Sequence, residues 1–373
     1  MRDTIKHAKR IVIKIGTSVI TDKKGRINSK YMKNLAKQIM GIKRQGKEII
    51  MVSSGAIGSG MEELQLNQRP RLIPLKQATA AIGQPLMMQA WRDVFKKYKQ
   101  SVAQLLITYK NFSHRETYLN LRNALGKLLA LGAIPVVNEN DVVSIEEIDA
   151  TFGDNDKLSS MVATRMDADL LIILSDVDGL YDHNPKRRKD AKLINTVEKI
   201  TKEIEKMAFD DKSSTRAVGG MKAKIEAAKI CMEDCCQMII ADGSEKNILT
   251  EIFEGEEIGT IFLCSPKKLS NKEKWISHSR SKGSLIIDDG AENALKNKRS
   301  LLPSGVKGLK GSFEVGDVVT LINNKKEIGK GLTDYSSSEL KRIKGKKTDK
   351  IEKILGYKNY DSVIRRENLI IKE

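Results

Sequence analysis

The chain has 373 residues, 40% of them hydrophobic and 31% charged, with a formal net charge of +18 at pH 7. This length favours two domains over one, and the composition excludes an intrinsically disordered chain. No apolar run approaches the roughly 18 residues that a bilayer span requires. Lys14 interrupts the first apolar run too early for a signal peptide. We therefore expect a globular cytoplasmic protein that does not enter a membrane.

The positive charge is concentrated in the last third of the chain. Residues 261–373 hold 25 basic and 14 acidic side chains, whereas residues 1–260 hold 41 and 34. Such a surface is either a solvated, lysine-rich face or an electrostatic footprint for phosphodiester backbones. Composition alone favours the solvated face and leaves the second interpretation open.

The cysteines raise the question of a metal site, because the stretch CMEDCC holds three of the four. The four histidines are scattered, and no spacing of cysteine and histidine matches a zinc pattern. Reduced, unliganded thiols are the better interpretation, and we expect no protein-bound metal.

Short β-branched runs alternate with segments of helical spacing through the first two thirds of the chain. In chain order the pattern predicts strands near 10–16, 47–53, 102–108, 133–141 and 169–176, and helices over 29–46, 116–132, 156–168 and 222–232. Such alternation is typical of a mostly parallel sheet with helices on both faces. In that architecture a ligand binds beyond the carboxyl ends of the strands.

The predicted carboxyl ends carry small polar residues in KIGTS, VSSGAIGSG, NEND and LSDVDG. Glycine and serine are ordinary turn residues, but four such turns at one sheet edge favour a phosphate site. Lys14 precedes the turn at Gly16, and Lys224 begins the helix after VGGM, where helix N–H groups also favour anions. Most lysines lie on surfaces, and Lys222 is the better candidate for a bystander.

An ordered set of motifs resembles the amino acid kinase family over nearly the whole chain: VIKIGTS, VSSGAIGSG, IPVVNENDVVS, FGDNDKLSS, LSDVDGLYDHNP and VGGMKAKIEAA. The resemblance implies an α/β fold whose mostly parallel sheet is sandwiched by helices. It also implies ATP-dependent phosphorylation of the γ-carboxylate of L-glutamate to L-glutamyl 5-phosphate, the first step of proline biosynthesis. ATP would be handled with Mg²⁺, and the resemblance further implies a homo-oligomer and feedback inhibition by proline.

By this resemblance, Lys14 and Lys224 stabilise the charge that develops during phosphoryl transfer, and Asp156 orients both lysines. Asp156 would not act as a base, because a γ-carboxylate acceptor is already ionised at neutral pH. The nucleotide side would consist of Lys14, Gly16, Ser175, Asp176, Val218, Gly219, Gly220, Met221, Lys222, Ala223 and Lys224. Val218 departs from the family, which usually has threonine there, and the lost hydroxyl places nucleotide affinity in question.

The amino acid site would consist of Ser54, Gly55, Asp141 and Asn155 by the same resemblance. Asp141 supplies an acceptor for the α-ammonium group, and Asn155 supplies donors for the α-carboxylate. The competing structural interpretations are a simple turn at Ser54 and a helix cap at Asp154 or Asn155. A residue can serve in both ways.

The C-terminal third resembles a PUA domain, a module otherwise found on RNA-modifying enzymes. The resemblance rests on LLPSGVKGLKGSFEVGDVVTL and IGKGLTDYSSSEL, whose glycines and short β-branched runs indicate a compact β-rich unit. We expect a kinase domain over 1–260, a linker over 261–277, the PUA-like domain over 278–356 and a tail over 357–373. The PUA-like domain would bind RNA weakly, mainly through phosphate contacts.

An alternative function is an RNA-binding or RNA-modifying protein whose kinase half is vestigial. Retention of Lys14, Asp156 and Lys224 argues against it, because a vestigial site need not keep two lysines and their organiser. Among kinases, one that acts on acetylglutamate, aspartate or a nucleotide is the nearest competitor. NEND, GDND and the basic C-terminal module together favour glutamate.

Overall fold

The computed structural model describes residues 2–22, 26–143, 155–185, 187–209, 220–264 and 271–371. The chain divides into two compact units, Met1–Lys268 and Leu269–Glu373. The stretch for which a linker was expected contains the end of β8 (Thr260–Phe262) and most of α12 (Asn271–His278). None of the helices in the described ranges is long and apolar enough to cross a membrane.

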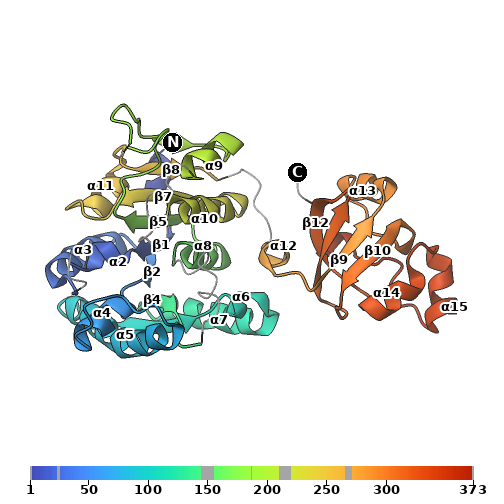
Figure 1. Ribbon diagram of the computed structural model, residues 1–373, viewed down its shortest axis with the longest axis horizontal. Helices are drawn as coiled ribbons and strands as arrows, with labels where there is room; N and C mark the ends of the chain where they lie inside the picture. The colour runs from blue at the N-terminus through green and yellow to red at the C-terminus, as the bar shows by residue number, and fades with distance from the viewer. Residues whose placement is uncertain are drawn as a thin grey trace. The chain divides into compact units, whose positions relative to one another are not determined.

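The described strands of the first unit form one sheet in the order β3-β4-β2-β1-β5-β7-β8-β6 (Figure 1). Neighbouring strands run parallel, except that β7 and β8 are antiparallel. The remaining strands are β1 (Arg10–Ile15), β2 (Glu48–Ser53), β3 (Val102–Ile107), β4 (Ile134–Glu139), β5 (Leu170–Ser175), β6 (Thr196–Val197) and β7 (Gln237–Asp242). The predicted mostly parallel α/β sheet is confirmed.

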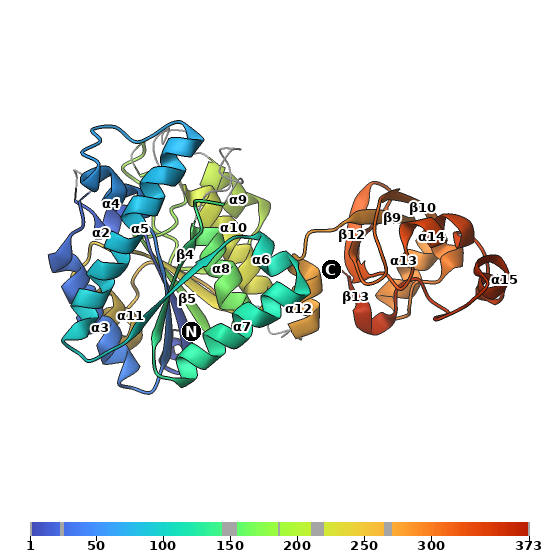
Figure 2. The ribbon, with the colours of Figure 1, turned by 90° about the horizontal axis from the view of Figure 1, so that it is seen from below.

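Helices cover both faces of this sheet, with α3, α5 and α11 on one side and α8 and α10 on the other (Figure 2). The helices of the first unit are α1 (Asp3–Lys6), α2 (Thr17–Ile20), α3 (Ser29–Lys43), α4 (Ala56–Glu63), α5 (Ile73–Lys96), α6 (Lys110–Ser113), α7 (Arg115–Ala130), α8 (Asn155–Arg165), α9 (Lys202–Phe209), α10 (Met221–Glu233) and α11 (Ile248–Glu254). The central strands are buried on both faces, which explains why their sequences read as nearly unbroken apolar runs.

The direction of the Lys14 side chain follows from the alternation of side chains along β1. Ile11, Ile13 and Ile15 belong to the core beneath α3, α5 and α11. Because successive side chains of a strand point to opposite faces, Lys14 points to the other face, where α8 packs on β1. Lys14 is therefore directed toward α8, the helix that begins with Asn155 and Asp156.

Helices α4 and α5 meet at their backbones, an arrangement that the sequence analysis did not anticipate. A methyl group on Gly83 would lie 1.8 Å from the carbonyl oxygen of Ala56, and one on Gly60 would lie 1.9 Å from that of Thr79. Only glycine permits this approach. Since α4 begins directly after Ser54 and Gly55, the close packing of α5 fixes the turn that ends β2.

The second unit has its own sheet, in the order β10-β9-β11-β12-β13, and its own hydrophobic core. Its elements are β9 (Gly283–Ile287), α13 (Asp289–Lys296), β10 (Val306–Gly311), β11 (Val318–Asn323), β12 (Lys326–Leu332), α14 (Ser337–Ile343), α15 (Ile351–Leu355) and β13 (Leu369–Ile371). The stretch expected as a tail is built into this unit, because β13 pairs with β12 and Val363 and Ile364 are buried.

Candidate active site

Asp156 joins two lysines that are far apart in the sequence. Its Oδ1 atom lies 2.5 Å from Nζ of Lys14, and its Oδ2 atom lies 3.0 Å from Nζ of Lys224. Asp156 is 0% exposed, and both lysines are also buried. The predicted transfer residues are therefore in contact with one another, at the carboxyl end of β1 and the first turns of α8 and α10.

The two lysines keep Asp156 ionised. Burial by itself would raise the pKa of this carboxyl, but the charges and hydrogen bonds of Lys14 and Lys224 lower it to about 2. At neutral pH the carboxylate therefore offsets part of the positive charge of the two ammonium groups. Positive charge at a buried position attracts anions strongly, because little water screens it.

Backbone groups around the lysines also suit phosphate. The N–H of Gly16 donates to the carbonyl oxygen of Leu174, and a methyl group on Gly16 would lie 3.2 Å from that oxygen and 3.8 Å from Nζ of Lys14. Gly220 starts α10, and no described side chain caps that helix. The positive end of its dipole therefore favours an anion at this point.

The remaining nucleotide-side residues lie at two places. Ser175 ends β5 and is buried, and its hydroxyl donates to the carboxylate of Asp176, which is exposed. Met221, Lys222 and Ala223 form the first turn of α10 with Lys222 exposed. Val218 and Gly219 lie outside the described residues.

A chain of amide groups links the predicted amino acid site to α5. Nδ2 of Asn155 donates to Oγ of Ser54 at 2.7 Å and to Oδ1 of Asn138 at 2.9 Å. Nδ2 of Asn138 then donates to Oε1 of Gln84, also at 2.9 Å. Gly55 has a φ of 111°, a left-handed conformation that glycine adopts without strain and that turns the chain after Ser54 into α4. Ser54, Gly55 and Asn155 are thus brought together at the ends of β2 and α8.

Asp141 lies to one side of this group. It lines a cavity of about 230 Å³ between α5 and the ends of β3 and β4, together with Gln84, Glu139 and Asn140. Gln84 is the residue that belongs both to this cavity and to the amide chain. Asp141 therefore shares a cavity with the residue at the far end of the amide chain from Asn155.

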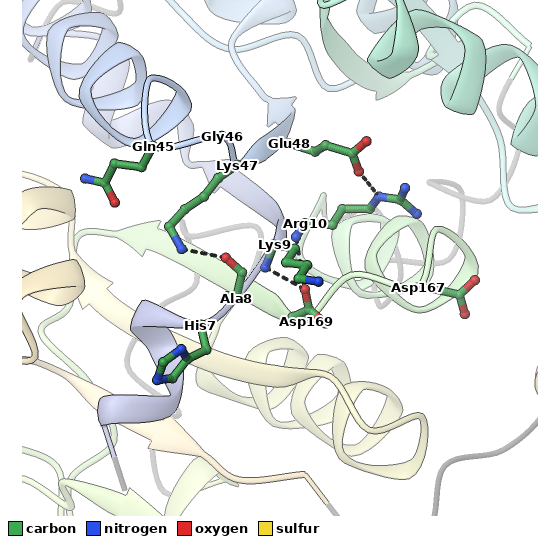
Figure 3. Close-up of a pocket in the computed structure, with 10 residues that line it drawn as sticks. All are labelled: His7, Ala8, Lys9, Arg10, Gln45, Gly46, Lys47, Glu48, Asp167 and Asp169. Atoms are coloured by element: carbon green, nitrogen blue, oxygen red, sulfur yellow. Dashed lines mark hydrogen bonds and ion pairs between the residues drawn. The ribbon is translucent and has the colours of Figure 1, made fainter.

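The larger hollow of the first unit, about 610 Å³, lies at the opposite, amino edge of the sheet (Figure 3). Its charged groups bind one another: Asp169 accepts from the backbone N–H groups of Lys9 and Arg10, and Arg10 pairs with Glu48 at 2.7 Å. Lys47 donates to the carbonyl oxygens of Lys6 and Ala8. These contacts hold the strand starts together, and the hollow contains none of the predicted site residues.

Metal ligation by the protein has little support in the described ranges, where no group of three His, Cys, Asp or Glu side chains could hold an ion. The four cysteines carry free thiols, and the sulfur atoms of Cys235 and Cys264 lie 3.2 Å apart. Two buried lysines and an uncapped helix start fit the phosphates of a nucleotide, so a metal ion would be held largely by those phosphates.

Comparison with known proteins agrees with this geometry. The sequence pattern of the amino acid kinase family matches residues 9–242, and that of the PUA domain matches residues 283–355. The chain belongs to the amino acid kinase family. It is 50% identical to a protein named glutamate 5-kinase from Methanococcoides burtonii, over 99% of this chain and 98% of that one. Proteins with the same name from Methanosarcina mazei and Thermoanaerobacter pseudethanolicus are 50% and 46% identical, each over 98% of this chain and over 96% and 98% of their own.

Two members of this amino acid kinase site were missed from the sequence. The motif NEND contains Asn138 but does not indicate its role, and Gln84 lies outside every motif. Gln84 lies on the buried face of α5, between Ala80, Met87 and Trp91. A polar residue at an apolar position of a helix is the signal that would have identified it.

Proposed function

We propose that the protein transfers the γ-phosphoryl group of ATP to the γ-carboxylate of L-glutamate and forms L-glutamyl 5-phosphate, the first intermediate of proline biosynthesis. The observation that carries this proposal is the buried contact of Asp156 with Lys14 and Lys224. The similarity to proteins named glutamate 5-kinase, over nearly the whole chain, supports glutamate as the acceptor.

The transfer brings together two anions, the γ-carboxylate and the nucleotide phosphates, so the site must offset their repulsion and keep them in line. Lys14 and Lys224 supply the positive charge, and Asp156 contacts both ammonium groups, one through each carboxylate oxygen. No proton has to be removed from the acceptor, and a carboxyl with a pKa of about 2 would be a poor base. Asp156 is therefore a positioning residue, and the lysines stabilise the transition state.

Mg²⁺ would accompany ATP and neutralise part of the phosphate charge. In this proposal Lys14, Gly16, Lys224 and the start of α10 bind the nucleotide phosphates, with Ser175 and Asp176 at the neighbouring strand end. These groups bind and orient the phosphates, and the burial of the lysines keeps water from competing for them.

The hydrogen bonds of the amide chain favour a different role for Asn155 from the one expected, as an acceptor instead of a donor. Both N–H bonds of the Asn155 side chain are occupied, by Ser54 and Asn138, so Asn155 has no side-chain donor left for the α-carboxylate. Its Oδ1 atom is buried and has no hydrogen-bond partner among the described residues, which makes it an acceptor for the α-ammonium group. The hydroxyl proton of Ser54 is the better donor to the α-carboxylate, because its oxygen already accepts from Asn155.

Several partners expected from the sequence remain proposals. Leu75, Ile82 and Leu86 are exposed on α5, at spacings that place them on one helix face, and Leu72 is exposed just before the helix, which favours a homo-oligomer. Inhibition by proline and weak RNA binding by the PUA domain rest on the resemblance, and a cytoplasmic location rests on the sequence. The alternative of an RNA-binding protein with a vestigial kinase half has no support in the intact contacts of Asp156.

The deciding experiment is a phosphoryl-transfer assay with purified protein, MgATP and hydroxylamine, which converts an acyl phosphate into a stable hydroxamate. L-Glutamate, N-acetyl-L-glutamate, L-aspartate and UMP are compared as acceptors, with ADP release measured in parallel. We expect hydroxamate and ADP with L-glutamate in excess over the other acceptors. Turnover with another acceptor and none with L-glutamate would refute the proposal.

A further inference from the structure

Gln84 is a buried polar residue for which the proposed reaction has no direct use. Its side chain is 7% exposed and lies among the apolar residues of α5. Burying an amide in such a place is unfavourable unless its hydrogen bonds are made. One of them is made, since Oε1 accepts from Asn138, whereas Nε2 has no partner among the described residues.

The hydrogen bonds of the amide chain all run in the same sense. Asn155 donates to the side-chain oxygen of Asn138, and Asn138 donates to the side-chain oxygen of Gln84. The two atoms left over are an acceptor at one end, Oδ1 of Asn155, and a donor at the other, Nε2 of Gln84. An amide can turn over and exchange its oxygen and nitrogen, so the sense of the chain has to be fixed by something outside Asn155 itself.

We propose that Gln84 is a positioning residue for the acceptor amino acid, and that it acts through Asn138 to keep Oδ1 of Asn155 facing the substrate. With an acceptor at position 84, Asn138 must turn its nitrogen toward α5 and its oxygen toward Asn155. Asn155 must then donate to that oxygen, and its own oxygen is left for the α-ammonium group. The inference rests on the proposed function, because it concerns how that reaction selects its acceptor.

The position of Gln84 in the fold suits this role. It follows Gly83, where α5 packs against the backbone of α4 so closely that a side chain at position 83 would clash. Helix α4 in turn begins at the Ser54–Gly55 turn. The same helix segment therefore holds both hydrogen-bond partners of the Asn155 nitrogen, Ser54 through the packing of α4 and Asn138 through Gln84.

Three variants test the inference by steady-state kinetics with L-glutamate and ATP. Gln84→Met has nearly the same length and loses the acceptor, whereas Gln84→Glu keeps an acceptor oxygen whether or not it is ionised. Gln89→Met is the matched control, because Gln89 lies on the exposed side of the same helix. We expect Gln84→Met to raise KM for glutamate by roughly tenfold to a hundredfold, as for the loss of a buried hydrogen bond, with a much smaller change in kcat and in KM for ATP. Gln84→Glu should recover most of that loss.

Coupling to Asn155 separates positioning from a general packing effect. If Gln84 acts through Asn155, then Gln84→Met should add little to the rise in KM already caused by Asn155→Ala, whereas independent effects would multiply. Thermal unfolding of each variant shows whether it is folded. If Gln84→Met does not fold, the same coupling to Asn155→Ala is measured with Gln84→Glu.

Each other outcome overturns the inference. An unchanged KM for glutamate in folded Gln84→Met shows that position 84 does not orient the site. Equal losses in Gln84→Met and Gln84→Glu indicate that Nε2 itself binds the ligand, and multiplicative losses with Asn155→Ala indicate packing alone. Failure of the proposed function is a different result, the absence of glutamate turnover by the unaltered protein.

Discussion

Replacing Asp156 by asparagine tests whether the buried charge cluster is held together by this one carboxylate. The substitution keeps the shape of the side chain but leaves the ammonium groups of Lys14 and Lys224 buried without an anion between them. At an effective dielectric constant of about 20, the two contacts of 2.5 and 3.0 Å correspond to attractions of about 7 and about 6 kcal/mol. Desolvation of three buried charges opposes most of this.

The pKa of Asp156 shows how far the attraction of the two lysines exceeds the cost of burying the carboxylate. A carboxyl whose pKa is about 2 instead of 3.8 is stabilised in its ionised form by about 2 kcal/mol after burial has been included. Removing one partner of a buried ion pair typically costs roughly 3 to 5 kcal/mol, because the other charges remain buried. We expect Asp156→Asn to lower the free energy of unfolding by this amount and to lower kcat strongly.

The dependence on pH identifies the carboxylate as the cause. Because the folded pKa of Asp156 lies below its unfolded value, the stabilisation is complete above about pH 4 and is lost as the pH falls toward about 2. The difference in stability between the unaltered protein and Asp156→Asn should therefore shrink as the pH falls from about 4 to about 2. Urea unfolding at several pH values, without ligands, measures it.

Asp167→Asn is the control for this experiment. Asp167 pairs with Arg122 at 2.7 Å, but both side chains are more than a quarter exposed. Such a partly solvated pair is expected to contribute less than about 1 kcal/mol. If Asp156→Asn is as stable as the unaltered protein, or if the difference does not change with pH, the electrostatic account of the cluster is wrong.

Three further predictions concern the same unit. Lys224→Ala should lower kcat by roughly a hundredfold or more with little change in KM for glutamate, whereas Lys222→Ala, at an exposed position of the same turn, should lose far less; an unchanged kcat in Lys224→Ala would make that lysine a bystander. Asp141→Ala and Asn155→Ala should raise KM for glutamate and leave KM for ATP nearly unchanged, and the reverse pattern in the same assays would move both residues to the nucleotide side. A chain that ends at Lys268 should fold and keep glutamate turnover, because it retains Ile261 and Phe262 of β8 and every proposed site residue; a folded but inactive truncation would show that the second unit is required for catalysis.

Local sequence patterns were sufficient for the main elements of the first unit. The runs around β1, β2, β4 and β5 are apolar because these strands are covered on both faces, and the helical spacing of α3, α7 and α10 reflects one buried side each, whereas α8 is buried along nearly all of its length. The long helix α5 was not predicted. It contains Pro74, Gly83 and Pro85, and glycine and proline normally indicate a turn or a break.

Lys14 could be recognised as a candidate because a charged residue inside an apolar strand has few structural uses. Gln84 could be distinguished from Gln89 only after α5 is recognised as a helix, because the two residues differ in which face of that helix they occupy. Whether Asn155 acts as a donor or an acceptor also could not be predicted from the sequence, because it depends on which groups accept from its two N–H bonds in the folded chain.

The sequence by itself determined which chemical groups are present and which segment carries each of them: two lysines, a carboxylate, small amides and glycine turns at strand ends. Only the tertiary structure decided which of these groups touch. Ser54 and Asn155 are 101 residues apart, and Asp156 and Lys224 are 68 apart, yet each pair is in contact. Such contacts depend on the order of the strands in the sheet and on the crossing of helices, which follow from the packing of all the elements together. A hydrogen bond between distant segments is therefore decided by the whole fold, because no local pattern contains both of its partners.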